Sequence, residues 1–117
     1  MEQKILDCTL RDGGLVNRFY FTDDFVRGLY QANLQAGIDY MEFGYKASEA
    51  LFDRREFGKW KFCREEDLRA VVGDNKTSMK ISVMADVGRT DYSKDILEKK
   101  DSVIDMVRIA AYAEQMG

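Results

Sequence analysis

The chain has 117 residues, with 18 basic and 21 acidic side chains and a formal net charge of −3. This length suits one hydrophobic core, and the near-balance of charge argues against nucleic acid or an acidic membrane as a partner. No apolar run approaches the ~18 residues that a membrane span needs, and the first residues do not resemble a signal peptide. We therefore expect a cytoplasmic protein in which Cys8 and Cys63, which lack metal-binding spacing, are reduced thiols.

The first element predicted is a short strand from Lys4 to Cys8, apolar enough to be covered on both faces. It is followed by Arg11, Asp12 and two glycines, which we interpret as a turn. Opposite charges after a buried strand are typical of a site in an α/β protein, because ligands bind at the carboxyl edge of a parallel sheet. The alternative is a surface ion pair beside a Gly-Gly turn.

An irregular connection rich in aromatic residues is predicted from Leu15 to Phe21. A helix then begins at Thr22, a good N-cap residue, and ends before Gly37, which is typical of a C-terminal cap. Its apolar stripe comprises Phe25, Val26, Leu29, Tyr30, Ala32 and Leu34.

The second strand is predicted from Ile38 to Tyr45 and contains one carboxylate, Glu42. An unpaired carboxylate in an apolar strand is costly, so Glu42 must pair, ligate a metal or take up a proton. A salt bridge to a neighbouring strand, with Arg11 as one candidate partner, would satisfy it. That structural explanation and a functional role are compatible at the edge of a sheet.

The remaining chain predicts six further segments. Residues 46–62 are expected to form a loop or short hairpin whose aromatic side chains pack down or contact a second subunit. A helix is expected over 65–72, a strand over 80–86 and a fourth strand over 102–110, with a charged, solvated stretch at 91–100. The start of a further helix is expected after the fourth strand, up to Gly117.

Strands and helices therefore alternate, which requires a parallel sheet with right-handed crossovers. We predict an α/β fold of the (β/α)₈ TIM-barrel type, of which residues 1–117 form the N-terminal part. The four βα units present amount to half a barrel.

The run Asp7-x-Thr9-Leu10-Arg11-Asp12-Gly13 resembles the opening strand of the metal-dependent aldolase, acyltransferase and lyase superfamily. This superfamily includes 4-hydroxy-2-oxovalerate aldolase, the isopropylmalate and homocitrate synthases, and hydroxymethylglutaryl-CoA lyase. The order of the elements downstream agrees with the family over the whole chain, and the resemblance is strongest to the branch described as having an aldolase catalytic domain.

The resemblance implies a reaction through an enolate, with Mn²⁺ or Mg²⁺ as cofactor and a 2-oxo acid such as pyruvate as substrate or product. By position, Asp12 corresponds to the carboxylate metal ligand and Arg11 to the catalytic residue that stabilises the enolate oxygen. Glu42 and Arg108 correspond to substrate-binding positions on the second and fourth strands. An oxygen ligand suits a hard cation, and a guanidinium suits an oxo acid.

Two departures from the family pattern limit what the resemblance implies. The family has a His-x-His pair of metal ligands late in the barrel, and this chain contains no histidine. The oxovalerate aldolases also place a histidine base three residues after the metal aspartate, where this chain has Leu15. The general base is therefore unassigned. Asp86 and Lys46 follow or end strands, and we interpret both as structural.

We expect a divalent-metal-dependent aldolase or lyase, of which this chain alone is inactive. An acyl-CoA condensing acyltransferase of the same superfamily is the enzymatic alternative. A non-catalytic barrel fragment with a structural or interaction role is the other. The exposed edges of a half sheet predict association with the remainder of the barrel or with further copies of the chain.

Overall fold

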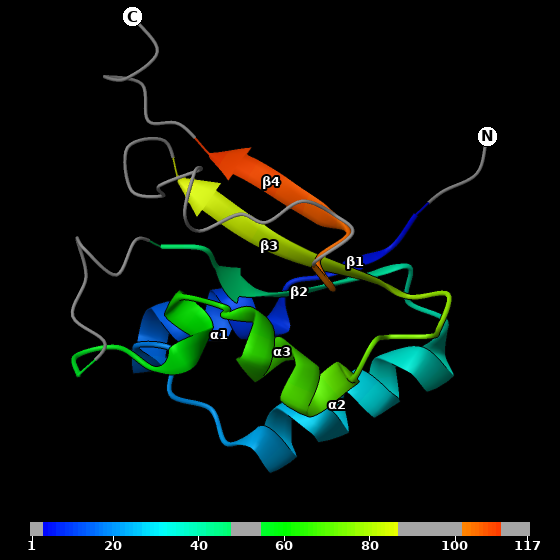
Figure 1. Ribbon diagram of the computed structural model, residues 1–117, viewed down its shortest axis with the longest axis horizontal. Helices are drawn as coiled ribbons and strands as arrows, with labels where there is room; N and C mark the ends of the chain where they lie inside the picture. The colour runs from blue at the N-terminus through cyan, green and yellow to red at the C-terminus, as the bar shows by residue number, and fades with distance from the viewer. Residues whose placement is uncertain (1–3, 48–54, 87–101, 111–117) are drawn as a thin grey trace, which may run out of the picture.

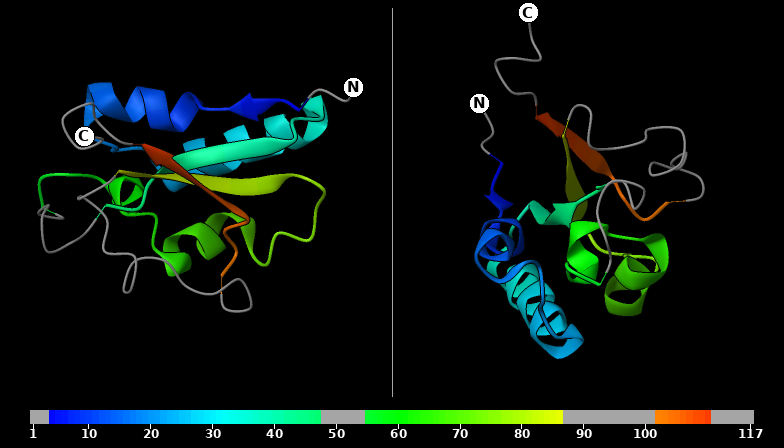
Figure 2. Two further views of the ribbon diagram at one scale, coloured as in Figure 1. Left: turned by 90° about the horizontal axis from the view of Figure 1, so that it is seen from above. Right: turned by 90° about the vertical axis from the view of Figure 1, so that its left-hand side faces the viewer.

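The computed structural model describes residues 4–47, 55–86 and 102–110. They form a four-stranded parallel sheet in the order β1-β2-β3-β4. Helices α2 and α3 lie together on one side of it (Figures 1 and 2). The elements are β1 (Leu6–Asp7), α1 (Thr9–Asn17), α2 (Asp23–Ala36), β2 (Tyr40–Tyr45), the 3₁₀ helix η1 (Lys59–Lys61), α3 (Glu65–Val72), β3 (Lys80–Asp86) and β4 (Met106–Ala110). The predicted parallel sheet with sequential strand order is confirmed.

Helix α2 begins and ends where its capping residues predict. The Thr22 side chain accepts a hydrogen bond from the backbone N–H of Phe25 at 3.1 Å, and Gly37 ends the helix with φ 75°. Val26 and Tyr30 face the core, as the apolar stripe predicts. Phe25 differs from that prediction, because it is 51% exposed and stacks on Phe21 instead.

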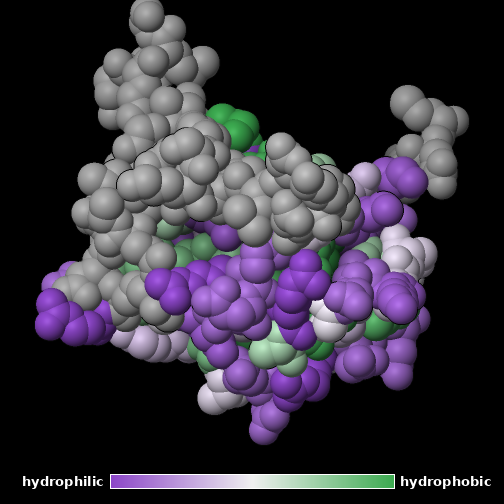
Figure 3. All heavy atoms as spheres, viewed as in Figure 1, coloured by the Kyte–Doolittle hydropathy of each residue, from purple (hydrophilic) through white to green (hydrophobic). Residues whose placement is uncertain are grey.

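Helix α3 also has the predicted bounds, and it packs beside α2. Arg27 of α2 donates a hydrogen bond to the backbone carbonyl of Ala70 in α3, at 3.1 Å. Leu68 of α3 is fully buried in the core shared with the sheet. The outer surfaces of these helices carry mostly hydrophilic side chains (Figure 3). Both helices are thus amphipathic, and together they form one layer on one face of the sheet.

The core lies between the sheet and these helices. Phe43 of β2 and Trp60 of η1 are both fully buried, with ring centroids 5.7 Å apart. Phe62 is also buried, so aromatic side chains of residues 46–62 pack down, as predicted. Gly44 permits this packing, because a Cβ there would lie 2.1 Å from the backbone oxygen of Trp60.

Two aspartates align the strands at the amino end of the sheet. The Asp39 carboxylate accepts a hydrogen bond from the backbone N–H of Ile5 at 2.7 Å. Asp105 accepts one from Ile81 at 2.9 Å. Each aspartate lies just before one strand and binds the backbone of the neighbouring segment, which is Ile5 just before β1 for Asp39 and Ile81 of β3 for Asp105. Polar contacts at this end therefore set strand register.

The prediction for the segment after β1 is wrong. β1 comprises two residues rather than five, and the expected Gly-Gly turn and the first half of the expected irregular connection belong to α1. The reason lies in tertiary packing. At Gly14 a Cβ would lie 2.0 Å from the ring of Phe19, so this glycine serves close packing of a helix and not a turn.

Several smaller differences concern element ends. β2 begins at Tyr40 and β4 at Met106, later than expected, whereas β3 has the predicted bounds. The described part of residues 46–62 contains a 3₁₀ helix and no strand, so it forms a loop and not a hairpin. The expected solvated stretch at 91–100 and the helix expected after β4 lie outside the described residues. No helix in the described ranges is long and apolar enough to cross a membrane.

Candidate functional site

The site is centred on Glu42, in the middle of β2. Its neighbours Met41 and Phe43 face the helix-side core, so Glu42 points to the opposite face of the sheet. In the strand register Glu42 lies beside Ser82 of β3. Arg108 of β4 lies on the same face of the sheet, two residues nearer the carboxyl end of the strands. Glu42 is fully buried, and a buried carboxylate without partners would cost several kcal/mol.

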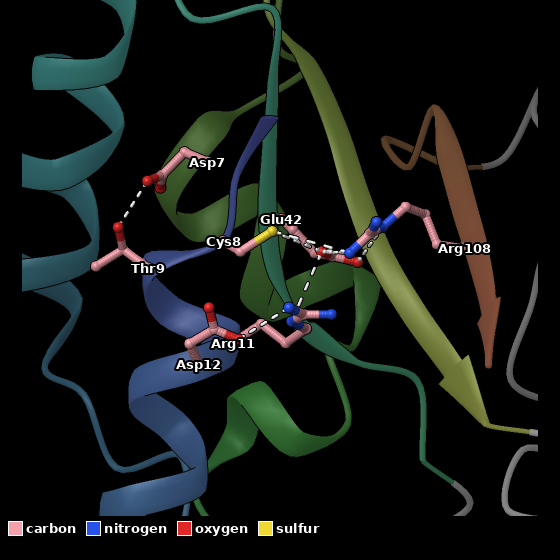
Figure 4. Close-up of polar contacts among 7 residues, drawn as sticks. All are labelled: Asp7, Cys8, Thr9, Arg11, Asp12, Glu42 and Arg108. Carbon is pink, nitrogen blue, oxygen red and sulfur yellow. Dashed lines mark hydrogen bonds and ion pairs between the residues drawn. The ribbon is translucent and has the colours of Figure 1, made fainter. Parts of the chain in front are cut away.

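Three side chains surround the Glu42 carboxylate: two come from the start of α1 and one from β4 (Figure 4). Arg108 donates two hydrogen bonds, from Nε to Oε1 at 3.2 Å and from Nη2 to Oε2 at 2.8 Å. The Cys8 thiol donates to Oε2 at 3.3 Å. Arg11 Nε lies 3.9 Å from the same oxygen, within ion-pair range but too far for a hydrogen bond.

Arg11 and Asp12 both lie in the first turn and a half of α1. Arg11 Nη2 donates to Asp12 Oδ1 at 2.8 Å, and the Arg11 side chain extends from there toward Glu42 (Figure 4). The Arg11 side chain is 21% exposed and that of Asp12 is 64% exposed. Arg11 Nε is buried without a hydrogen-bond partner among the described residues. Arg11 therefore links an exposed carboxylate to a buried one.

Phe19 holds α1 against the end of β2. The backbone N–H of Phe19 donates a hydrogen bond to the Gly14 carbonyl at 3.0 Å. Phe19 itself has the left-handed backbone conformation, just after the end of the helix. Its ring packs edge-on against Tyr45 at the carboxyl end of β2, with centroids 5.5 Å apart. Lys61 lies over the rings of Phe19 and Tyr45. This contact keeps the helix that carries Arg11 beside the strand that carries Glu42.

The charges in the cluster are balanced, with two guanidiniums and two carboxylates. The hydrogen bond to Glu42 raises the pKa of Arg108. Burial opposes the charge of Arg11, but the hydrogen bond to Asp12 and the Glu42 charge outweigh it and raise its pKa. Burial, followed by the hydrogen bond to Glu42, raises the pKa of the Cys8 thiol. At neutral pH Cys8 is therefore a protonated thiol and a hydrogen-bond donor.

Asp12 is the candidate metal ligand of the cluster. Its exposed carboxylate offers the oxygen donor that Mg²⁺ and Mn²⁺ prefer, and Mg²⁺ is commonly held by one or two carboxylates together with water and substrate oxygens. The described residues contain no group of three or more His, Cys, Asp and Glu side chains that could hold a metal ion. Asp12 thus fits one coordination position, with Arg11 competing for one of its oxygens.

The structure brings three of the four predicted site residues, Arg11, Glu42 and Arg108, into one cluster. Asp12 joins them through Arg11. Asp86 ends β3, and Lys46 is buried near Cys63. Burial raises the pKa of the Cys63 thiol, and the charge of Lys46 offsets only part of that rise.

Cys8 was not predicted as a site residue. Its position directly after the first strand, at the edge where ligands bind, was a sequence signal that could have identified it.

A hollow of about 420 Å³ lies at the far end of α1 from Arg11. It is lined by Phe19, Tyr20, Phe21, Thr22, Phe57, Gly58 and Lys59. Lys59 forms an ion pair with Asp23 there, so the charge in this hollow is already compensated.

Comparison of the chain with protein-family models, with curated proteins and with solved structures finds no match in any of the three. Function is therefore argued from the site itself.

Proposed function

We propose that the chain carries part of the active site of a divalent-metal-dependent aldolase or lyase that cleaves or forms a C–C bond next to a 2-oxo acid through an enolate. The single observation that carries the proposal is the placement of two guanidiniums, Arg11 and Arg108, on either side of the buried Glu42. The motif containing Arg11 and Asp12 supports it, because that motif resembles the opening of a superfamily with this chemistry.

The guanidiniums are suited to an oxo acid. Glu42 engages Nε and Nη2 of Arg108, which fixes the plane of the guanidinium and leaves its Nη1 edge to receive a substrate carboxylate. Such preorganised donors need little rearrangement when negative charge develops.

Arg11 is assigned to the oxygen on which the enolate charge develops. Its side chain is mostly buried, so its electrostatic effect is less screened than in water. Stabilising the enolate oxygen lowers the barrier for breaking the neighbouring C–C bond. Asp12 would hold part of a divalent cation's coordination shell, and such a cation supplies Lewis-acid polarisation of a carbonyl.

We further propose that the four-stranded sheet is half of a (β/α)₈ barrel. The sequential parallel order supports this, since a barrel extends the same order to eight strands. Ile5, which precedes β1, and Ile109 of β4 belong to the two edges of the sheet and are both more than half exposed. Their burial by further strands would complete the apolar layer.

The test is pyruvate release by the full-length protein from a panel of 4-hydroxy-2-oxo acids, measured with Mn²⁺, with Mg²⁺ and with a chelator. Metal-dependent release of pyruvate is expected. The control replaces Phe25, an exposed side chain of α2 away from the cluster, by Ser, and this variant should retain activity. Absence of turnover across the panel with either cation would refute the proposal.

A further inference from the structure

The proposed reaction needs a group that moves protons, and the sequence supplies no histidine for it. We propose that Glu42 and Cys8 form the acid–base couple, in which the Cys8 thiol passes protons between the substrate and the buried carboxylate. This inference rests on the proposed function and names the missing base of the same site.

Glu42 is a carboxylate and can accept a proton, but it is fully buried and cannot contact a substrate directly. Any proton must reach it through one of its hydrogen-bonded or ion-paired neighbours. Among the described residues these are Arg108, Arg11 and Cys8. An arginine cannot give up a proton in a protein, so only the thiol of Cys8 can relay one.

The position of Cys8 suits a relay. It lies between β1 and α1 at the carboxyl edge of the sheet and is partly exposed, whereas Glu42 is not. Its Sγ is 3.3 Å from Glu42 Oε2, and Arg108 Nη2 lies 3.8 Å from the same sulfur. A guanidinium at that distance stabilises the negative charge that sulfur carries during transfer. Because its pKa is raised, the thiol holds a proton at neutral pH.

A second observation points to a ligand at this place. Ser82 is fully buried beside Glu42 on the same face of the sheet, and its hydroxyl has no hydrogen-bond partner among the described residues. Buried hydroxyl groups are nearly always paired, so an unpaired one calls for a further polar group nearby. A buried water at this position would supply it, and such a water would lie next to the Glu42 carboxylate.

The proton balance closes without any further reagent. In cleavage, the 4-hydroxyl proton of the substrate passes to Cys8 Sγ while the thiol proton passes to Glu42 Oε2. The O–H electron pair forms the new C=O bond, the C3–C4 bond breaks, and its electrons form the enolate. The Glu42 proton then returns to sulfur as the thiol proton bonds to C3. The hydroxyl proton has been replaced by a C–H proton, and both residues are restored.

The experiment measures exchange of the C3 hydrogens of pyruvate for deuterium in D₂O by NMR, using the full-length protein with Mn²⁺. The variants are Cys8→Ala, Cys8→Ser and the matched control Cys63→Ala, which removes the other thiol of the chain. Pyruvate affinity and the unfolding temperature are measured for each. Cys8→Ala should lower the exchange rate by about 100-fold or more, the scale of general acid–base catalysis. Cys63→Ala should leave it unchanged.

The order of the two Cys8 variants separates a relay from packing. Serine keeps an O–H that can hydrogen-bond to Glu42, so Cys8→Ser should exchange faster than Cys8→Ala while both bind pyruvate normally. If Cys8→Ala exchanges the C3 hydrogens as fast as Cys8→Ser, or faster, the relay is overturned and the proposed function is left intact. Absence of both pyruvate binding and exchange in the wild-type protein overturns the proposed function together with the relay.

Discussion

The two faces of the sheet differ in what their buried residues do. On the face toward α2 and α3, Met41, Phe43 and Val83 are fully buried among other apolar side chains. On the opposite face Glu42 is equally buried, and its polar partners among the described residues are two guanidiniums and a thiol. Burial of apolar surface stabilises the fold, whereas burial of a paired charge contributes little net stability or opposes it. We therefore assign the proposed function to the buried polar residues of this second face.

We therefore expect substitutions on the two faces to affect different properties of the protein. A substitution on the helix side should lower the free energy of unfolding and leave the turnover of folded molecules unchanged. A substitution in the Glu42 cluster should affect turnover more than stability, or should lower stability in a way that removing the partner charge repairs.

The largest effect is expected at Phe43. Phe43→Ala removes a fully buried ring that packs on Trp60, and it should lower the free energy of unfolding by about 3–5 kcal/mol. Urea denaturation monitored by tryptophan fluorescence measures this. At temperatures where the variant is folded, its kcat should match the wild type. A loss of kcat in folded molecules would contradict the division between the faces.

Arg11→Ala should lower kcat by about 100- to 1,000-fold, the effect of deleting a donor to a developing oxyanion. Metal affinity should change little, and added Mn²⁺ should not restore the rate. Steady-state kinetics at several Mn²⁺ concentrations and calorimetric titration of Mn²⁺ measure both properties.

Asp12→Asn is the matched contrast, because its side chain is exposed and touches Arg11 rather than Glu42. Cation affinity and activity should fall together in this variant, and excess Mn²⁺ should recover part of the rate. Equal Mn²⁺ binding by the wild type and Asp12→Asn would remove the basis for the metal assignment. A loss of stability alone in both variants would make Arg11 and Asp12 a structural ion pair.

Arg108→Met should lower the free energy of unfolding by about 2 kcal/mol, less than the loss of a fully buried partner, because the Arg108 side chain is 35% exposed. The cause is the unpaired charge left on Glu42. In the double variant Glu42→Leu/Arg108→Met no charge is left unpaired, so stability should return to near the wild-type value while activity remains absent. Chemical denaturation of the wild type and of these two variants tests this. A double variant that is less stable than Arg108→Met would refute it.

The smallest effect concerns the pH dependence of stability that the buried Cys63 thiol causes at alkaline pH. Burial raises the pKa of Cys63 far above its usual range. Between the unfolded pKa of about 8.5 and the raised folded value, the unfolded state releases a proton that the folded state keeps, so stability falls as pH rises. The slope should reach at most about 1.4 kcal/mol per pH unit. Cys63→Ala should show a shallower slope in denaturation curves at pH 8–10.

Local signals in the sequence determined helices α2 and α3 and most of the sheet. The Thr22 cap and Gly37 delimit α2, apolar periodicity delimits α3 and β3, and their alternation determines a parallel sheet. The single carboxylate of an otherwise apolar strand was sufficient to predict that Glu42 would need a partner, with Arg11 as one candidate.

The tertiary structure alone decided two features. α1 forms across Gly13 and Gly14 because Phe19 packs on it, although glycine disfavours an isolated helix by about 1 kcal/mol per residue. Cys8 contacts Glu42, 34 residues away, and Arg108 reaches the same carboxylate across 66 residues. Such contacts depend on strand register and helix position, which residue patterns within one segment do not encode.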